Sequence, residues 1–223
     1  MLTTNNSDFK KNSTNDFGAL LQKMHAWCPN METNTSIVEH RLANNQPVDL
    51  LVEDYYCTSD CDFSGFSKIK QANITDQGTT PTVVISDRTD FDDCTKVIHV
   101  VPKESTLGIS CREDVSYGDV QTAFALFMSI NHLSWNSIKL ITSIDASQNQ
   151  ANIQYLAQVL QAKTQFYSKE QLLQTAINYQ TSPSLKNNLG IGNVASSAAN
   201  LASGKVIFIP EFSSKNVSLA LCH

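Results

Sequence analysis

The stretch Thr106-Leu107-Gly108-Ile109-Ser110-Cys111-Arg112 decides the fold of the C-terminal half of this chain. An apolar run ends there, and the spacing of apolar residues at 117–130 predicts an amphipathic helix. A turn from strand to helix leaves backbone N–H groups unpaired at the helix start, which favours anions. Gly108 permits the close approach of backbone or ligand, and Arg112 adds a permanent charge with a forked donor geometry. The motif therefore predicts an anion-binding turn.

Strands alternate with helices on both sides of this stretch. We expect strands at 48–52, 82–86, 96–101, 106–110, 138–144, 164–167, 206–209 and 217–221. We expect helices from Asp16, at 36–42 behind a capping box of Ser36 and Glu39, at 117–130, at 151–162, from Ser168, and from an Asn193 cap to Ala202. Such alternation predicts an α/β fold with a mostly parallel sheet that helices cover on both faces.

The order of these segments suggests two small α/β domains. We expect a flexible lead-in at 1–15, a first domain at 16–104 and a second domain at 105–223 with the mostly parallel sheet. Residues 53–80 are polar and rich in turn formers, so they read as an excursion with little regular structure. Carboxyl ends of parallel strands meet at one edge, where ligands of such sheets bind. Cys111, Asp145 and Glu211 are expected at such ends.

Composition narrows the possible classes of function. The 223 residues are 41% hydrophobic and 17% charged, which predicts a packed core. The 16 basic and 21 acidic residues give a net charge of −5. A mildly acidic chain is a poor general binder of nucleic acid, because that affinity comes mainly from neutralising phosphates. An anionic ligand must therefore be held by a local site.

The N-terminal sequence and the cysteines indicate the cellular compartment in which the protein is expected. The N-terminal sequence MLTTNNSDFKKNS lacks the apolar core of a signal peptide. No apolar run approaches the roughly 18 residues that a membrane-spanning helix needs. We therefore expect a cytoplasmic protein without membrane contact, with free thiols. The six cysteines are Cys28, Cys57, Cys61, Cys94, Cys111 and Cys222.

Three residues at the predicted strand ends have both a functional and a structural reading. Cys111 is either a nucleophile or ligand contact, activated at a helix start beside an arginine, or a small buried residue. Arg112 either grips a carboxylate with two hydrogen bonds or pairs with Glu113 or Asp114. Asp145 is either a general base or ligand acceptor, or a turn residue before the next helix.

Other motifs carry less weight. Residues 190–195 match G-x-G-x-x-A, but the strand that a dinucleotide site requires before the first glycine is missing. Cys57 and Cys61 lack a second ligand pair at zinc spacing, so we expect no metal site. The acidic run at 87–93 reads as a solvated loop.

Several segments together carry a family resemblance: GISCR at 108–112, SID at 143–145, GIGNVASSAANLASG at 190–204, IPEFSSKNVSLAL at 209–221 and PTVVISDR at 81–88. The four segments between residues 108 and 221 resemble the C-terminal domain of the CbiG family of cobalamin-biosynthesis proteins, the cobalt-precorrin-5A hydrolases. The same half is similar to CobE. The segment at 81–88 and the helix–helix–strand order at 16–52 resemble the CbiG central domain.

This resemblance implies a ligand and a reaction. The family opens the δ-lactone of a cobalt-bearing tetrapyrrole and releases acetaldehyde, so cobalt would arrive with the substrate and no cofactor is expected. A separately encoded CbiG N-terminal domain, which the resemblance leaves unmatched here, or another corrin-pathway enzyme is an expected partner. The chain departs from the family where basic residues are usual: Glu113 and Asp114 follow Arg112, Glu211 follows Pro210, and Ser147 follows the SID segment.

The resemblance and the residues together give a set of expected contacts with the tetrapyrrole. Catalytic residues stay unassigned. We expect the substrate-binding residues to be Gly108, Cys111, Arg112, Asp145, Gly192, Asn193, Lys215 and Asn216. Two alternatives remain open: a non-catalytic corrinoid-binding or carrier module, and an α/β interaction domain that has lost its ligand.

Overall fold

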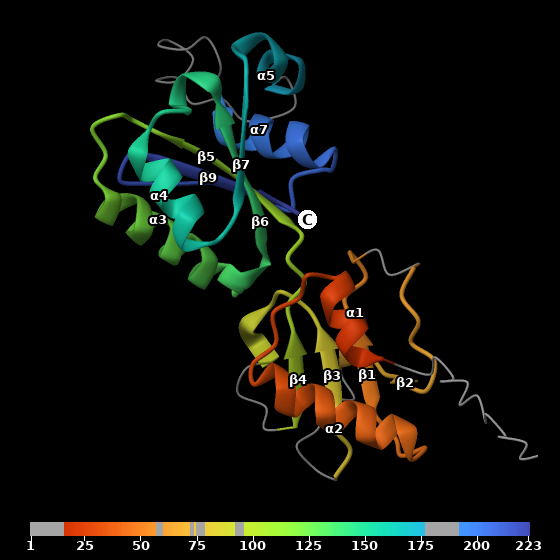
Figure 1. Cartoon of the computed structure of the whole chain (residues 1–223). Helices are drawn as coiled ribbons and strands as arrows, with labels where there is room; N and C mark the ends of the chain where they lie inside the picture. Colours follow the sequence, from red (N-terminus) through yellow and green to blue (C-terminus); the bar gives the residue numbers. More distant parts are fainter. Residues whose placement is uncertain (1–15, 57–59, 72–73, 75–78, 92–95, 177–191) are drawn as a thin grey trace, which may run out of the picture.

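The computed structural model describes residues 16–56, 60–71, 74, 79–91, 96–176 and 192–223. Two sheets dominate the described part, as Figure 1 shows, and the expected α/β fold is confirmed. The first sheet is parallel throughout, with strand order β2-β1-β3-β4. Its strands are β1 (Asp49–Val52), β2 (Ser67–Lys68), β3 (Thr82–Ile85) and β4 (Val97–Val100). The expected lead-in at 1–15 lies outside the described residues.

Two helices precede the first sheet, α1 (Phe17–Lys23) and α2 (Met31–Ala43). Asp16 caps α1 as expected, since its side chain accepts a hydrogen bond from Ala19 N. The capping box expected at Ser36 is wrong, because α2 already begins at Met31 and Ser36 lies inside it. Asn30 precedes α2 in the left-handed conformation and makes no side-chain cap.

The second sheet has strand order β7-β6-β5-β9-β8. β5, β6 and β7 are parallel, while β9 is antiparallel to both β5 and β8. Only β9 among these five strands therefore runs against the others. The strands are β5 (Ser105–Cys111), β6 (Ile138–Ile144), β7 (Lys163–Tyr167), β8 (Ile209–Ser214) and β9 (Val217–Cys222). The expected strand at 206–209 is wrong, since pairing with β9 starts at Ile209.

Helices cover both faces of the second sheet (Figure 1). One face packs on α3 and α4 around a core that includes Leu107, Ile109, Phe124, Phe127 and Ile141. The other face packs on α7, which α5 contacts in turn. Their bounds are α3 (Tyr117–Ile130), α4 (Ala151–Val159), α5 (Lys169–Ala176) and α7 (Val194–Ser203). None of the helices described is long and apolar enough to cross a membrane.

Backbone hydrogen bonds join a segment of the first half of the chain to a segment of the second half. Thr89 N donates to His132 O at 2.8 Å, and Ser134 N donates to Asp87 O at 2.7 Å. Between these bonds, Arg88 and Leu133 form an isolated β-bridge. The segment after β3 is thereby fixed against the segment after α3.

Candidate functional site

The structure brings most of the expected site residues to one edge of the second sheet. β5 ends at Cys111, and β6 ends at Ile144 directly before Asp145. Cys111 is paired with Val217, so the β8–β9 turn with Lys215 lies beside the end of β5. We call this region the carboxyl edge. The expectation that parallel strands would gather Cys111 and Asp145 at one edge is confirmed. The expectation that Glu211 ends a strand is wrong, because Glu211 lies inside β8.

Gly108 serves packing between backbone segments. A Cβ atom built on it would lie 1.9 Å from Ala195 O and 3.0 Å from Ala199 Cβ. Only a residue without a side chain lets α7 approach β5 this closely. The close approach expected at Gly108 is thus met by a helix of the same chain.

Cys111 has the properties of a neutral thiol. Its Sγ donates to Gln150 Oε1 at 3.2 Å, and burial raises its pKa to about 11. A thiol with such a pKa is protonated near neutral pH and is a weak nucleophile. This environment supports the interpretation of Cys111 as a small packed residue and not as a nucleophile.

Both expected cations at the carboxyl edge already have acidic partners. Arg112 pairs with Asp114 at 2.8 Å, with both side chains 67% exposed, and Lys215 pairs with Asp119 at 2.7 Å. The hydrogen bond from Lys215 lowers the pKa of Asp119. With Asp145 exposed nearby, acidic side chains outnumber basic ones among these residues. The edge therefore does not attract anions through net charge.

The remaining expected residues cap helices or form turns. Asp145 Oδ1 accepts from Ala146 N at 2.7 Å, and Asn193 Oδ1 accepts from Ser196 N at 2.8 Å at the start of α7. Lys215 and Asn216 both have positive φ, 51° and 61°, in the two-residue turn between β8 and β9. Gly192 is buried before the Asn193 cap, whereas Gly190 and Ile191 of the glycine motif lie outside the described residues.

The opposite edge of the second sheet holds a cleft that sequence reasoning missed. Its volume is about 450 Å³, and we call it the lysine cleft because Lys139, Lys163 and Lys205 line it. Lys139 and Lys163 stand at the starts of β6 and β7. The sequence could have predicted this cleft, because basic residues at the starts of neighbouring parallel strands lie together at one edge of the sheet.

A buried polar cluster lies where the two sheets meet. Tyr55 donates to Asp87 Oδ1 at 2.6 Å and stacks on His223 with ring centroids 4.3 Å apart. The expected solvated loop is wrong for Asp87, whose residue is 0% exposed. Burial raises the pKa of Asp87 and, together with the charge of Lys205, lowers the pKa of His223 to about 4. The cluster therefore holds a neutral imidazole near neutral pH.

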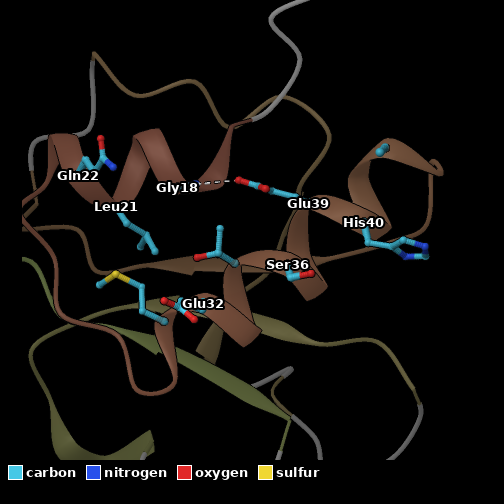
Figure 2. A pocket seen from close by; sticks show the side chains of 10 residues that line it. Gly18, Leu21, Gln22, Glu32, Ser36, Glu39 and His40 are labelled. Atoms are coloured by element: carbon cyan, nitrogen blue, oxygen red, sulfur yellow. Dashed lines mark hydrogen bonds between the residues drawn. The ribbon is translucent and has the colours of Figure 1, made fainter.

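A third hollow lies between α1 and α2, as Figure 2 shows. Its volume is about 660 Å³, and Glu32, Glu39 and His40 are among its lining residues. Glu39 Oε1 accepts from Gly18 N at 3.0 Å and so ties the two helices together. The acidic lining does not suit an anionic ligand. Among the residues that the structure describes, no group of three His, Cys, Asp or Glu side chains could hold a metal ion.

The fold and the strand-end residues define a two-sheet α/β protein whose second sheet is mixed and enclosed by helices. A family model for the C-terminus of cobalamin synthesis protein G matches residues 105–222, which include every strand of this second sheet. The chain belongs to this family, and the resemblance seen in its motifs is confirmed. Membership supports a role in cobalamin biosynthesis.

Three solved structures have some similarity to this chain, each at a sequence identity of 20% or less. CobE, a protein from the cobalamin biosynthetic pathway, is 20% identical, with a TM-score of 0.49 over 54% of this chain and 89% of CobE. A putative cobalamin biosynthesis protein G homolog from Sulfolobus solfataricus is 16% identical, with a TM-score of 0.42 over 94% of this chain and 60% of that one. A cobalamin biosynthesis protein from Agrobacterium tumefaciens is 18% identical, with a TM-score of 0.39 over 52% of this chain and 95% of that one. No curated protein matches significantly.

Proposed function

We propose that this chain binds a cobalt-bearing tetrapyrrole of cobalamin biosynthesis and takes part in opening the lactone of cobalt-precorrin-5A. The observation that carries the proposal is the family match, which runs from the start of β5 to the end of β9. The cobalt belongs to the substrate. We place this activity in the cytoplasm, together with the rest of such a pathway.

The carboxyl edge is the proposed place for carboxylates of the macrocycle. The ion pairs of Arg112 with Asp114 and of Lys215 with Asp119 are exposed. Such surface pairs contribute only about 0–1 kcal/mol, so a ligand carboxylate can replace the aspartate at little cost. Arg112 offers a forked donor for this exchange. Gly108, Cys111, Gly192 and Asn193 then act by shaping the edge, and Asp145 and Asn216 line it.

Lactone opening also needs an activated water and a donor for the developing oxyanion. Cys111 is a protonated thiol, and Asp145 caps its own turn with one carboxylate oxygen. The described carboxyl edge therefore suits substrate binding better than water activation. In this proposal the groups that activate water belong to another part of the enzyme, such as a separately encoded CbiG N-terminal domain.

Two measurements test this proposal. The first titrates the protein with cobyrinic acid, a cobalt corrinoid with free peripheral carboxylates, and follows its visible absorption. The second measures acetaldehyde released from cobalt-precorrin-5A, with and without the partner domain. Spectral binding with acetaldehyde release supports the hydrolase role, and absence of any corrinoid binding contradicts the proposal and favours an interaction domain without ligand.

Arg112→Ala tests the carboxyl edge. We expect about three- to tenfold weaker binding of cobyrinic acid, as loss of one exposed ion pair contributes about 1 kcal/mol. Arg112→Lys should recover part of the loss, and Lys169→Ala on α5 serves as the charge-matched control. Equal affinity in the wild-type protein and Arg112→Ala would remove Arg112 from the site.

A non-catalytic corrinoid-binding module is the second candidate. The raised pKa of Cys111 favours it, because a protonated thiol is a weak nucleophile. It predicts spectral binding of cobyrinic acid without acetaldehyde release, even after the partner domain is added.

A further inference from the structure

The lysine cleft lies on the α7 face of the second sheet, at the edge opposite the expected site. Thr106, Leu140 and Lys163 are neighbours across β5, β6 and β7, and all three line the cleft. The register slips between Ser105 and Thr106, so Lys139 and Leu140 together face Thr106. This extra residue in β6 explains how Lys139 also reaches the cleft.

The third lysine comes from the end of α7. Gly204 ends this helix with a positive φ of 66°, and Lys205 follows it. The backbone of Lys205 is held in place, since Asn200 Nδ2 donates to its carbonyl at 2.6 Å and its N–H donates to Ser203 Oγ at 3.1 Å. A strand start, a neighbouring strand start and a helix end thus each direct one lysine to the same hollow.

The three ammonium groups have no ion pair or hydrogen bond within the part of the chain that is described. Glu104 is the single acidic side chain among the lining residues, so positive charge is in excess. Like charges around one hollow repel one another, and a bound anion would remove this cost. At the carboxyl edge, by contrast, both cations are already paired.

His223 gives a second, independent sign of a ligand. It lines the cleft and is only 7% exposed, and its Nε2 is buried without a hydrogen-bond partner. Its Nδ1 lies 3.2 Å from Ser105 Oγ and 3.4 Å from Asp87 Oδ2, and this carboxylate oxygen accepts no hydrogen bond. The arrangement fits a hydroxyl donating to Nδ1, which leaves the Nε2–H as an unused donor. Buried polar groups without partners are rare in folded proteins and call for an explanation.

We propose that the lysine cleft binds an anion with two or more carboxylates, held by Lys139, Lys163 and Lys205 around the edge of His223. A hollow of about 450 Å³ is in the range of small-ligand pockets and holds a small polycarboxylate whole. The same chemistry is offered by the peripheral carboxylates of a macrocycle whose ring stays outside. Binding of the macrocycle rests on the proposed function, whereas binding of a small polycarboxylate does not.

Calorimetric titration with citrate and absorption titration with cobyrinic acid distinguish these sources. The test variant is Lys139→Ala/Lys163→Ala, and Lys70→Ala/Lys169→Ala is the control with the same change in charge. We expect at least about tenfold weaker binding in the test variant for the ligand that uses the cleft, and little change in the control. Binding should also weaken as ionic strength rises. Cobinamide, whose corrin carries amides in place of carboxylates, should bind equally to both variants.

The outcomes separate this proposal from the proposed function. Citrate binding that depends on the lysines, without any corrinoid binding, supports the cleft and contradicts the proposed function. Cobyrinic acid binding that depends on Lys139 and Lys163 but not on Arg112 supports the cleft and removes the macrocycle from the carboxyl edge. Unchanged affinity of the test variant for both ligands, or an equal loss in the control, overturns the lysine cleft as a site.

Discussion

Ala195 O lies 1.9 Å from the point where a Cβ atom would stand on Gly108. The obstacle is a backbone carbonyl, which cannot rotate away as a side chain can. We therefore predict that Gly108→Ala forces α7 away from β5 and lowers the free energy of unfolding by about 3 kcal/mol, at the upper end of the usual cost of overpacking. Urea unfolding followed by circular dichroism measures this loss.

Gly118→Ala is the matched control for Gly108→Ala. Gly118 lies in the first turn of α3, and the nearest atom to its added Cβ is Ser116 Oγ at 3.9 Å. Alanine should there be neutral or stabilise the protein by up to about 1 kcal/mol, because it favours the helix. Similar stability in both variants would contradict the packing role of Gly108.

The thiol of Cys111 should react slowly near neutral pH. Because burial raises its pKa to about 11, the thiolate that alkylating reagents attack is scarce at pH 7. We predict that alkylation by iodoacetamide, measured by mass spectrometry of the peptide containing Cys111, accelerates steadily from pH 7 to pH 10. A rate that levels off below pH 8 would show an activated thiolate and revive the nucleophile hypothesis.

Asn193 should matter for stability through its cap on α7. Its Oδ1 accepts from Ser196 N, and the residue is 2% exposed. Asn193→Ala should lower the free energy of unfolding by about 1–2 kcal/mol, whereas Asn193→Ser, which keeps a cap acceptor, should lose less. Equal losses would indicate that another contact of Asn193 dominates.

The imidazole of His223 should destabilise the protein as the pH falls. Its pKa is about 6.5 when unfolded and is lowered to about 4 in the folded protein, so the unfolded state binds more protons between these values. Stability should thus fall from pH 6.5 to pH 4, by at most roughly 3 kcal/mol.

The neighbouring Asp87 has the opposite effect on stability. Because its pKa is raised in the folded state, the folded protein takes up this proton at a higher pH than the unfolded chain, so acidification stabilises the protein through Asp87. Asp87→Asn removes this opposing effect. We therefore compare urea unfolding of Asp87→Asn with that of Asp87→Asn/His223→Gln at pH 7 and pH 4.5. The double variant should lose less stability on acidification, and parallel losses would show that His223 titrates normally.

The sequence predicted β5, β6 and β9 well because each of these strands is a largely apolar run closed by a turn. Val206 misled the assignment of β8, since this apolar residue is 83% exposed and the ladder with β9 begins three residues later. In α2 the pair Ser36 and Glu39 has the spacing of a cap, yet Glu39 instead accepts from Gly18 in a different helix. Local spacing cannot reveal a partner that comes from elsewhere in the chain.

The sequence predicted where the residues of the carboxyl edge lie better than it predicted their ion pairs. Alternation of strands and helices brought Cys111, Asp145 and Lys215 to one edge. The sequence also offered Asp114 as a partner of Arg112, but it did not predict Asp119, on a different element, as the partner of Lys215. The burial of Asp87 depends on Tyr55 and His223, which are far from it in sequence. The lysine cleft was missed for a similar reason, because three separate elements contribute one lysine each.

The bridge between Arg88 and Leu133 and the two backbone hydrogen bonds beside it have an evolutionary consequence. Recombination that kept only one half would leave Asp87 O and His132 O without these donors and would uncover the ring of His223 against Tyr55. Each half has its own sheet, and the contacts at this seam fit the two halves to each other. A descendant that replaces one half must acquire matching residues at this seam in the other.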